Sequence, residues 1–201
     1  MPFDDTAGPA FPASGDESGF AVALPDARAP QRVARLRDLG LYDTPEEEFD
    51  ELATRLAQDA AALLGLEYAP HAMVNWRTDQ HQYFAGLHVS TAGAQGSDAA
   101  DGPEMARTMP LDYGYCPEVV EIGLARVHDD VCAHPRFQAN EVVDRLGIRS
   151  YGGAPVKDPR TGLILGTACF VDTEPRKWGR EAMKLVKNVA EELTEIVWQR
   201  D

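Results

Sequence analysis

Two segments near opposite ends of this 201-residue chain most constrain its fold. The first, residues 39–50, reads LGLYDTPEEEFD and predicts the start of a long amphipathic helix. Thr44 is placed to cap that helix, Pro45 suits its first position, and Glu47 completes the spacing of a capping box. The second, residues 166–176, reads GTACFVDTEPR and has the apolar character of a buried strand that leaves a sheet. Together the two segments predict a protein that combines helices with a buried sheet.

The charge and the cysteine content limit the classes of partner. The formal net charge is -14, which would repel the phosphates of nucleic acids and of an anionic membrane surface. The sequence has no apolar run of membrane-spanning length, and its start lacks the basic and apolar regions of an export signal. Three cysteines, an odd number in a chain of this size, favour reduced thiols over a disulfide framework. We therefore expect a soluble cytoplasmic protein that binds neither nucleic acid nor membranes.

The composition divides the chain into a leader and one domain. Residues 1–30 are rich in Gly, Pro, Ala and Asp and have no apolar periodicity, so they predict a disordered acidic leader. Residues 31–201 are long enough for one hydrophobic core and are expected to form a single domain. Within that domain, residues 91–102 are small and polar, which is typical of a mobile surface loop.

Hydrophobic periodicity and turn residues predict the remaining elements. Helices are expected at residues 31–39, 45–64, 117–123, 138–146 and 179–199, and strands at 71–76, 81–85, 107–110, 125–128, 148–157 and 163–172. The pattern predicts the α+β class, with a central antiparallel sheet, helices on both of its faces, and the N- and C-terminal helices packed together.

The last predicted helix has the apolar spacing of a coiled coil. Ala182, Val186, Val189, Leu193 and Ile196 alternate steps of four and three residues. This seam can pack on the sheet of its own chain. Additional apolar residues broaden the surface beyond one stripe, which predicts a homodimer formed through a helix bundle.

The ordered motifs of the chain resemble the GAF domain, a small-molecule-binding sensory module. The resemblance runs from about residue 31 to the C-terminus. It rests on RVARL at 32–36, LGLYDTPEEEFD at 39–50, DQ at 79–80, Cys116, HPRF at 134–137, GIRSYGGAP at 147–155 and GTACFVD at 166–172. It implies a GAF-like fold and a non-enzymatic sensory or regulatory function, with signalling through a protein partner or a dimer contact.

The resemblance also implies a ligand pocket between the sheet and the elements that connect its middle strands. Its candidate wall is Trp76, Tyr83, Phe84, Tyr113, Tyr115, Cys116, Val119, Arg149 and Tyr151, with Met109 beside it. Aromatic faces with few polar groups are typical of small-molecule pockets. The same side chains can instead fill the core, which would leave a protein-interaction module with a vestigial pocket. Neither the ligand nor a cofactor is identified by the sequence.

Cys116 is the candidate reactive thiol. It precedes Pro117 at a predicted helix start, where a thiolate is favoured. An inert buried thiol, a nucleophile, a redox sensor and a bilin attachment point are the alternatives, although bilin-binding relatives have His where this chain has Pro117. Free methionine-R-sulfoxide reductases also resemble this fold, and Cys116 with Cys132 would be the enzyme's thiols. That family has a segment with two cysteines about ten residues apart before the helix, and this chain lacks it, because no cysteine precedes Cys116. Cys169 is expected in the core.

Two further groups have both a structural and a functional interpretation. Arg149 suits either an anionic ligand or an ion pair with Asp130. His128, Cys132 and His134 are potential zinc ligands, but their spacing matches none of the common zinc motifs. We therefore expect a structural ion pair and a polar loop at these positions. The motif of cyclic-nucleotide-binding relatives is absent from the sequence.

Overall fold

The computed structural model describes residues 26–91 and 106–200, and its centre is an antiparallel sheet. The strands are β1 (His71–Arg77), β2 (His81–His88), β3 (Thr108–Pro110), β4 (Arg126–His128), β5 (Ser150–Lys157) and β6 (Ile164–Asp172). Their order across the sheet is β3-β2-β1-β6-β5-β4, and each neighbouring pair is antiparallel. The central pair, β1 and β6, therefore joins segments almost a hundred residues apart in sequence.

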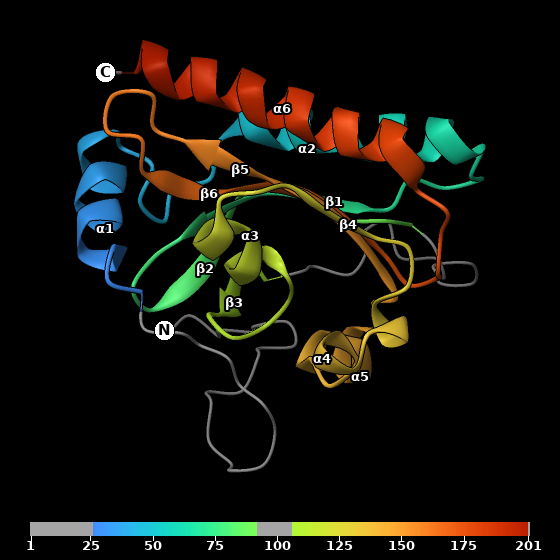
Figure 1. The fold of residues 1–201 in the computed structure, drawn as a ribbon. Coiled ribbons are helices and arrows are strands. Elements are labelled where there is room, and N and C mark those ends of the chain that lie inside the picture. Colours follow the sequence, from blue (N-terminus) through green and yellow to red (C-terminus); the bar gives the residue numbers. More distant parts are fainter. Residues whose placement is uncertain (1–25, 92–105, 201) are drawn as a thin grey trace, which may run out of the picture.

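Helices cover both faces of this sheet (Figure 1). They are α1 (Ala29–Asp38), α2 (Glu47–Leu64), α3 (Cys116–Ile122), α4 (Pro135–Gln138), α5 (Glu141–Leu146) and α6 (Gly179–Gln199), with a 3₁₀ turn, η1, at Val131–Ala133. The long helices α2 and α6 pack together on one face, and α3, α4 and α5 lie on the other. The predicted α+β fold is confirmed. In the described part of the chain, no helix is both long and apolar enough to cross a bilayer.

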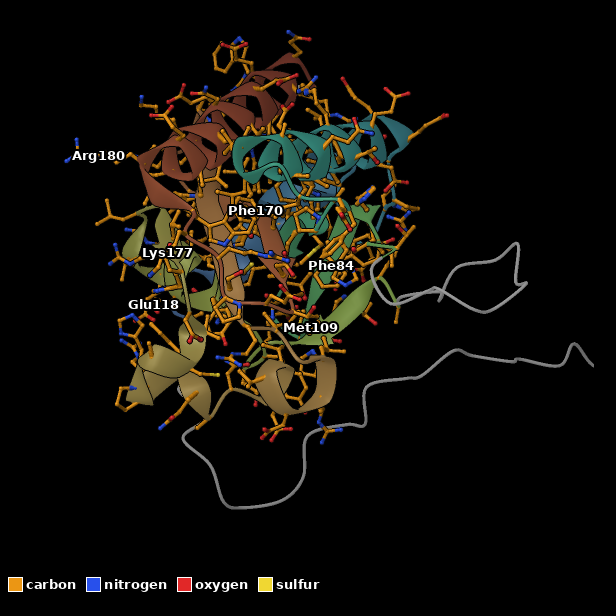
Figure 2. All side chains as sticks on the ribbon, turned by 90° about the vertical axis from the view of Figure 1, so that its right-hand side faces the viewer. Phe84, Met109, Glu118, Phe170, Lys177 and Arg180 are labelled. Atoms are coloured by element: carbon orange, nitrogen blue, oxygen red, sulfur yellow. The ribbon has the colours of Figure 1, made fainter. Side chains whose placement is uncertain are left out.

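Strand alternation divides the core into two layers. Successive side chains of a strand point to opposite faces of the sheet. On β6, Phe170 therefore joins the core under α2 and α6, whereas Cys169 joins the core under α3. Figure 2 shows Phe170 near the long helices and Met109 on the other side, where Met109 lines a small cavity together with residues of α5. The two layers have different chemistry, as described below.

The predicted capping box at the start of α2 is wrong. The N-cap residue is Glu46, which makes no side-chain capping bond, and the helix begins at Glu47. The Thr44 hydroxyl instead donates to the Tyr42 carbonyl oxygen over 3.0 Å. The reason is tertiary: the Glu46 N–H donates to the Ala85 carbonyl oxygen of β2, so the chain is held against the sheet before the helix starts.

The helix predicted at 138–146 is α5, which begins three residues later, at Glu141, and Gln138 is instead the last residue of a separate short helix, α4. The Asn140 side chain accepts from the Val142 N–H and caps α5. It also exchanges two hydrogen bonds of 2.9 Å with the backbone of Gly114. One amide side chain thus starts α5 and fixes the loop before α3.

The boundary of the predicted leader is also shifted. Residues 26–30 were expected in the leader, but Ala29 begins α1 and Asp26 forms ion pairs with Arg32 and Arg77. The folded part of the chain therefore starts earlier than the composition indicates. Residues 1–25, and the predicted loop beyond Thr91, lie outside the described residues.

The apolar seam of α6 is used within the chain. Ala182, Val186, Val189 and Leu193 are buried in the core between α6 and the sheet. The outward surface of α6 is mainly charged, with Trp198 exposed near its end. The homodimer stays a prediction, and the seam itself does not provide its interface.

A buried ion pair ties α1 to the turn between β5 and β6. The Asp158 side chain is fully buried, and Arg35 donates to both of its carboxylate oxygens over 2.9 and 3.1 Å. Thr161 donates to the same carboxylate. Burial raises the pKa of Asp158, but the hydrogen bonds and the charge of Arg35 outweigh burial and hold the pKa below its usual value. The carboxylate is therefore ionised at neutral pH.

Asp158→Asn is expected to lower the free energy of unfolding by about 3 kcal/mol at pH 7, because it leaves the partly buried Arg35 without its counter-charge. Since the folded-state pKa is depressed, the stabilisation is present above the unfolded pKa of about 4 and is lost as the pH falls through the lower folded value. Urea unfolding at pH 7 and at pH 3 measures both effects. Glu181→Gln is the control, because the Glu181–Lys184 pair is exposed. An equal effect of the two substitutions would contradict this role.

Candidate functional site

Six of the predicted pocket residues lie together on the α3 face of the sheet. They are Phe84, Tyr113, Tyr115, Cys116, Val119 and Tyr151, and they share one core layer with Met109. The Tyr115 ring packs against the rings of Phe137 and Tyr151, with centroids 5.6 and 5.4 Å apart. These six residues are therefore neighbours in one layer, and their role as the wall of a ligand pocket stays a prediction.

Trp76 and Tyr83 lie on the other face, so their placement in the pocket wall was wrong. Both belong to the core under α2 and α6. The Trp76 ring stacks edge-on against Phe49 of α2, with ring centroids 5.8 Å apart. The physical reason is the two-residue period of a strand, which sends Arg77, and not Trp76, toward α3.

Arg149 does not line either of the two cavities described below. It forms a bidentate ion pair with Asp130, in which Arg149 Nη2 lies 3.1 and 3.0 Å from the two carboxylate oxygens. The structural interpretation of Arg149 is thus the observed one.

The aromatic wall leaves little open space. The cavity beside it has a volume of about 40 Å³ and is lined by Met73, Gln82, Phe84, Met109, Tyr115, Cys116, Val142 and Tyr151, among others. Small-molecule pockets usually measure about 300–1,000 Å³. This cavity admits a molecule of water size and not an organic ligand.

A larger cleft lies on the outer side of α3. Its volume is about 450 Å³, and it is bounded by the chain before α1, the end of β1, α3 and α4. Its charged lining residues are Asp26, Arg28, Arg32, Arg77, Asp112, Glu118, Glu121 and Arg136. Figure 2 labels Glu118, which marks the α3 side of this cleft. Charges of both signs at one concave surface are suited to a polar ligand.

Arg77 is the unusual residue of this cleft. It is 7 % exposed, and its Nε has no hydrogen-bond partner among residues 26–91 and 106–200. That Nε lies 3.2 Å from Asp26 Oδ2, close enough for an ion pair but not aligned for a hydrogen bond. Burial lowers the pKa of Arg77, while the charge of Asp26 raises it. A buried guanidinium with unused donors is costly unless another group completes its partners.

Asp26 is shared between two arginines. Arg32, which is also buried, donates to the Asp26 carboxylate and to the Ile164 carbonyl oxygen. Burial raises the pKa of Asp26, but the hydrogen bond from Arg32 and the charges of Arg32 and Arg77 lower it below its usual value. The first described residue of the chain thus places a carboxylate between two buried cations.

A buried amide pair supports the rim of the same cleft. The Asn75 side chain donates to Gln82 Oε1 over 2.9 Å. Gln82 in turn donates to the carbonyl oxygens of Pro110 and Tyr113 over 2.7 and 2.8 Å. One amide therefore positions the loop that carries Asp112 and Gly114 into the cleft wall.

The histidines after β4 form an aromatic cluster. The His128 ring lies 4.6 Å from the Phe137 ring and 5.6 Å from the His134 ring, centroid to centroid. Burial, followed by the neighbouring His134, lowers the pKa of His128 to about 4. Among the described residues, no three His, Cys, Asp or Glu side chains are grouped as a metal ion would require.

The sequence pattern of the GAF domain matches residues 48–196, which is most of the chain. The chain belongs to the GAF domain family. A search of curated proteins found no match.

Solved structures with a similar fold include GAF domains and free methionine-R-sulfoxide reductases. The GAF domain of the Acinetobacter phosphoenolpyruvate-protein phosphotransferase is 14% identical, with 87% of this chain and 95% of that one covered and a TM-score of 0.49. The A. aeolicus nlh2 GAF domain is 15% identical, with 86% and 98% covered and a TM-score of 0.49. A type II free methionine-R-sulfoxide reductase from Thermoplasma acidophilum is 12% identical, with 74% and 93% covered and a TM-score of 0.45.

In this GAF domain, Cys116 has a thiol partner that the sequence did not indicate. The sulfur atoms of Cys116 and Cys169 lie 3.4 Å apart, and neither cysteine forms a disulfide. Cys132 is elsewhere, on η1. Cys169 was correctly expected in the core. Its alternation with Phe170 on β6 is the sequence signal from which its place on the α3 face could also have been predicted.

Gln82→Met is expected to lower the free energy of unfolding of the GAF domain by about 3 kcal/mol, because it removes three hydrogen bonds at a buried position: the one that Gln82 accepts from Asn75 and the two that it donates to the carbonyl oxygens of Pro110 and Tyr113. Chemical denaturation measures the change. Gln80→Met is the matched control, since Gln80 is exposed in the turn between β1 and β2. A loss no larger than that of the control would show that water satisfies these groups and that Gln82 does not hold the cleft rim.

Proposed function

We propose that this GAF domain is a non-enzymatic sensory or regulatory module that binds a small organic anion in the cleft beside α3. The ligand's carboxylate or phosphate group lies against Arg77 and Arg32. Binding changes a contact with a signalling protein or with a second copy of the chain. The family supports the general role, and Arg77 supports the location and the charge of the ligand.

The under-bonded Arg77 guanidinium is the observation that carries this proposal. Guanidinium groups bind carboxylate and phosphate through two parallel hydrogen bonds, a geometry that Asp26 does not provide to Arg77. The cleft volume of about 450 Å³ lies within the usual range of small-molecule sites. Tyr115 and Phe137 add aromatic surface for the rest of the ligand.

Ligand binding is converted into a structural change by competition between the anion and Asp26 for the two arginines. An anion that binds Arg77 and Arg32 competes with the Asp26 carboxylate, which anchors the chain just before α1. Occupancy of the cleft then shifts the population between an anchored and a released state of this segment. The ligand shifts this equilibrium only because it binds the released state more tightly than the anchored state.

The closely packed aromatic wall favours a role in core packing, and not in ligand binding, for the apolar side of α3. A cavity of about 40 Å³ does not hold an organic ligand, so the apolar pocket implied by the family resemblance is vestigial in this proposal. If the cleft also binds nothing, the domain is an interaction module alone.

Small anions are expected to raise the melting temperature of the wild-type domain in a concentration-dependent way, because a ligand of the folded state adds RT ln(1 + [L]/Kd) to stability. Thermal denaturation with acetate, succinate, citrate and inorganic phosphate measures this effect. Arg77→Met should abolish the anion-dependent increase, whatever its own melting temperature. Asp26→Asn should instead increase affinity, because it removes the competing carboxylate.

Arg55→Met is the matched control, because Arg55 is exposed on α2, on the opposite face of the sheet, and pairs with Glu192. It should keep the full anion-dependent increase. An increase that survives Arg77→Met would place the anion elsewhere. If none of the four anions raises the melting temperature and the purified protein carries no ligand in native mass spectrometry, the interaction module is the better description.

A thiol-dependent enzyme is the second candidate, and the Cys116–Cys169 pair is the observation that favours it. Reduction of methionine sulfoxide by an enzyme needs one thiol to attack the substrate and another to resolve the sulfenic acid. The small cavity beside Cys116 opposes this function because an amino-acid substrate would not fit. Turnover of free methionine-R-sulfoxide that is lost in Cys116→Ala would establish the enzyme, and we expect no turnover.

A further inference from the structure

We propose that Cys116 and Cys169 are a peroxide-reactive dithiol that closes a reversible disulfide between α3 and β6. Their sulfur atoms lie 3.4 Å apart in the reduced protein, and a disulfide requires about 2.05 Å. The necessary approach is a small movement of Cys116, the first residue of the short helix α3, toward the central strand. Both residues are buried, so other protein thiols do not reach this pair.

The surroundings of the pair stabilise a thiolate on Cys116. The Tyr151 hydroxyl donates to Cys116 Sγ over 3.5 Å. Gly153 makes room for that hydroxyl, since a Cβ at this position would lie 2.1 Å from the Tyr151 oxygen. Thr167 adds a buried hydroxyl oxygen that has no hydrogen-bond partner within the described residues. The Tyr151 hydroxyl therefore provides the buried Cys116 sulfur with a hydrogen-bond donor.

The two thiols differ in their readiness to ionise. The hydrogen bond between the two cysteines lowers the pKa of Cys116 against the effect of burial, and the Tyr151 hydroxyl acts in the same direction. The same hydrogen bond, together with burial, raises the pKa of Cys169. The bond from the Tyr151 hydroxyl and the direction of the pKa shift both favour Cys116 as the thiol of the pair that ionises first.

The cavity geometry assigns the order of reaction. The cavity of about 40 Å³ is lined by Cys116 and not by Cys169. Its size suits hydrogen peroxide, which is only slightly larger than water, and excludes organic peroxides. Cys116 is thus the thiol that meets the oxidant, and Cys169, on the sheet behind it, is the resolving thiol.

The chemistry balances in two steps. The Cys116 thiolate attacks one oxygen of hydrogen peroxide, the O–O bond breaks, and the released hydroxide takes up the thiol's proton to leave as water. Cys116 is now a sulfenic acid. The Cys169 sulfur then attacks the Cys116 sulfur, the S–O bond breaks, and the hydroxyl leaves with the Cys169 proton as a second water. Two thiols are oxidised by two electrons in total, and one peroxide is reduced to two waters. On the denatured chain, thiol–disulfide exchange with a dithiol reverses the reaction.

The test is oxidation of the folded chain with hydrogen peroxide, followed by catalase, thiol blocking in denaturant and non-reducing peptide mapping by mass spectrometry. The expected product is a Cys116–Cys169 disulfide within one chain, which dithiothreitol removes. Because the bond closes a loop of more than fifty residues, the melting temperature of the oxidised protein should rise by roughly 5 °C or more.

Single substitutions separate the two roles. Cys169→Ala should stop the reaction at a Cys116 sulfenic acid, which dimedone traps when it is added together with the denaturant, and Cys116→Ala should leave Cys169 unmodified. Cys132→Ala is the matched control and should form the disulfide at the wild-type rate, because Cys132 lies on η1. Tyr151→Phe should slow the first step several-fold and still give the same product.

Three outcomes would overturn the proposal: unreacted thiols in the folded wild-type protein, a disulfide that includes Cys132, or direct conversion of Cys116 to a sulfinic acid without cross-linking. The wild-type experiment needs no variant to fold. The result is also independent of the anion cleft, because disulfide formation is measured without a ligand, and Arg77→Met can fail to bind anions while the dithiol still closes.

Discussion

The two-residue period of β1 and β6 is the constraint on which the rest of this structure depends. These strands lie at the centre of the sheet and are covered on both faces. Their successive side chains therefore alternate between the core layer under α2 and α6 and the core layer under α3. Toward α2 and α6 the strands send Val74, Trp76 and Phe170 into an apolar layer. A shift of one residue in either strand would exchange the two layers, which makes the register of this central pair decisive for the position of each functional group.

The two faces of the sheet differ in the free energy needed to bury their side chains. The layer under the long helices is built almost entirely from aliphatic and aromatic side chains, and it accounts for most of the apolar burial. The layer under α3 contains Asn75, Gln82, Arg77 and a pair of thiols between its apolar groups. Burying such groups opposes folding unless each one finds a partner. We interpret the face under α2 and α6 as the main source of stability. The face under α3 carries the polar groups and thiols of the proposed sites, although burying them lowers stability.

The sequence predicted those features that depend on local patterns or ordered motifs. The class, most strands, α6 and the position of the aromatic wall follow from periodicity and from the motif order. The errors occur where tertiary contacts override local preference. Thr44 has the ideal spacing for a cap, but the hydrogen bond of Glu46 to β2 decides where α2 starts. Asn140 interrupts a helical pattern because its side chain binds the backbone at Gly114.

The candidate site was harder to predict because its key contacts join distant segments. Arg77 reads as the first residue of a turn, and only the fold shows that it is the last residue of β1 and that its partner is Asp26, in the segment expected to be disordered. The Cys116–Cys169 contact spans 53 residues and two elements of different type, so no spacing rule indicates it. Strand alternation alone predicts part of this site, because it places Cys169, Thr167 and Arg77 on one face of the sheet and Trp76 on the other.

Helix α3 connects the two proposed sites. Its first residue is one member of the dithiol, and its outer surface forms a wall of the anion cleft. It has only seven residues and is capped by no side chain, so its position depends on tertiary contacts more than on its own helical stability. A disulfide to β6 would fix the helix at one end, and an anion between Arg77 and Arg32 would act on it from the other side. Each change alters the free energy of the same element, so an effect of one on the other requires no direct contact between peroxide and ligand.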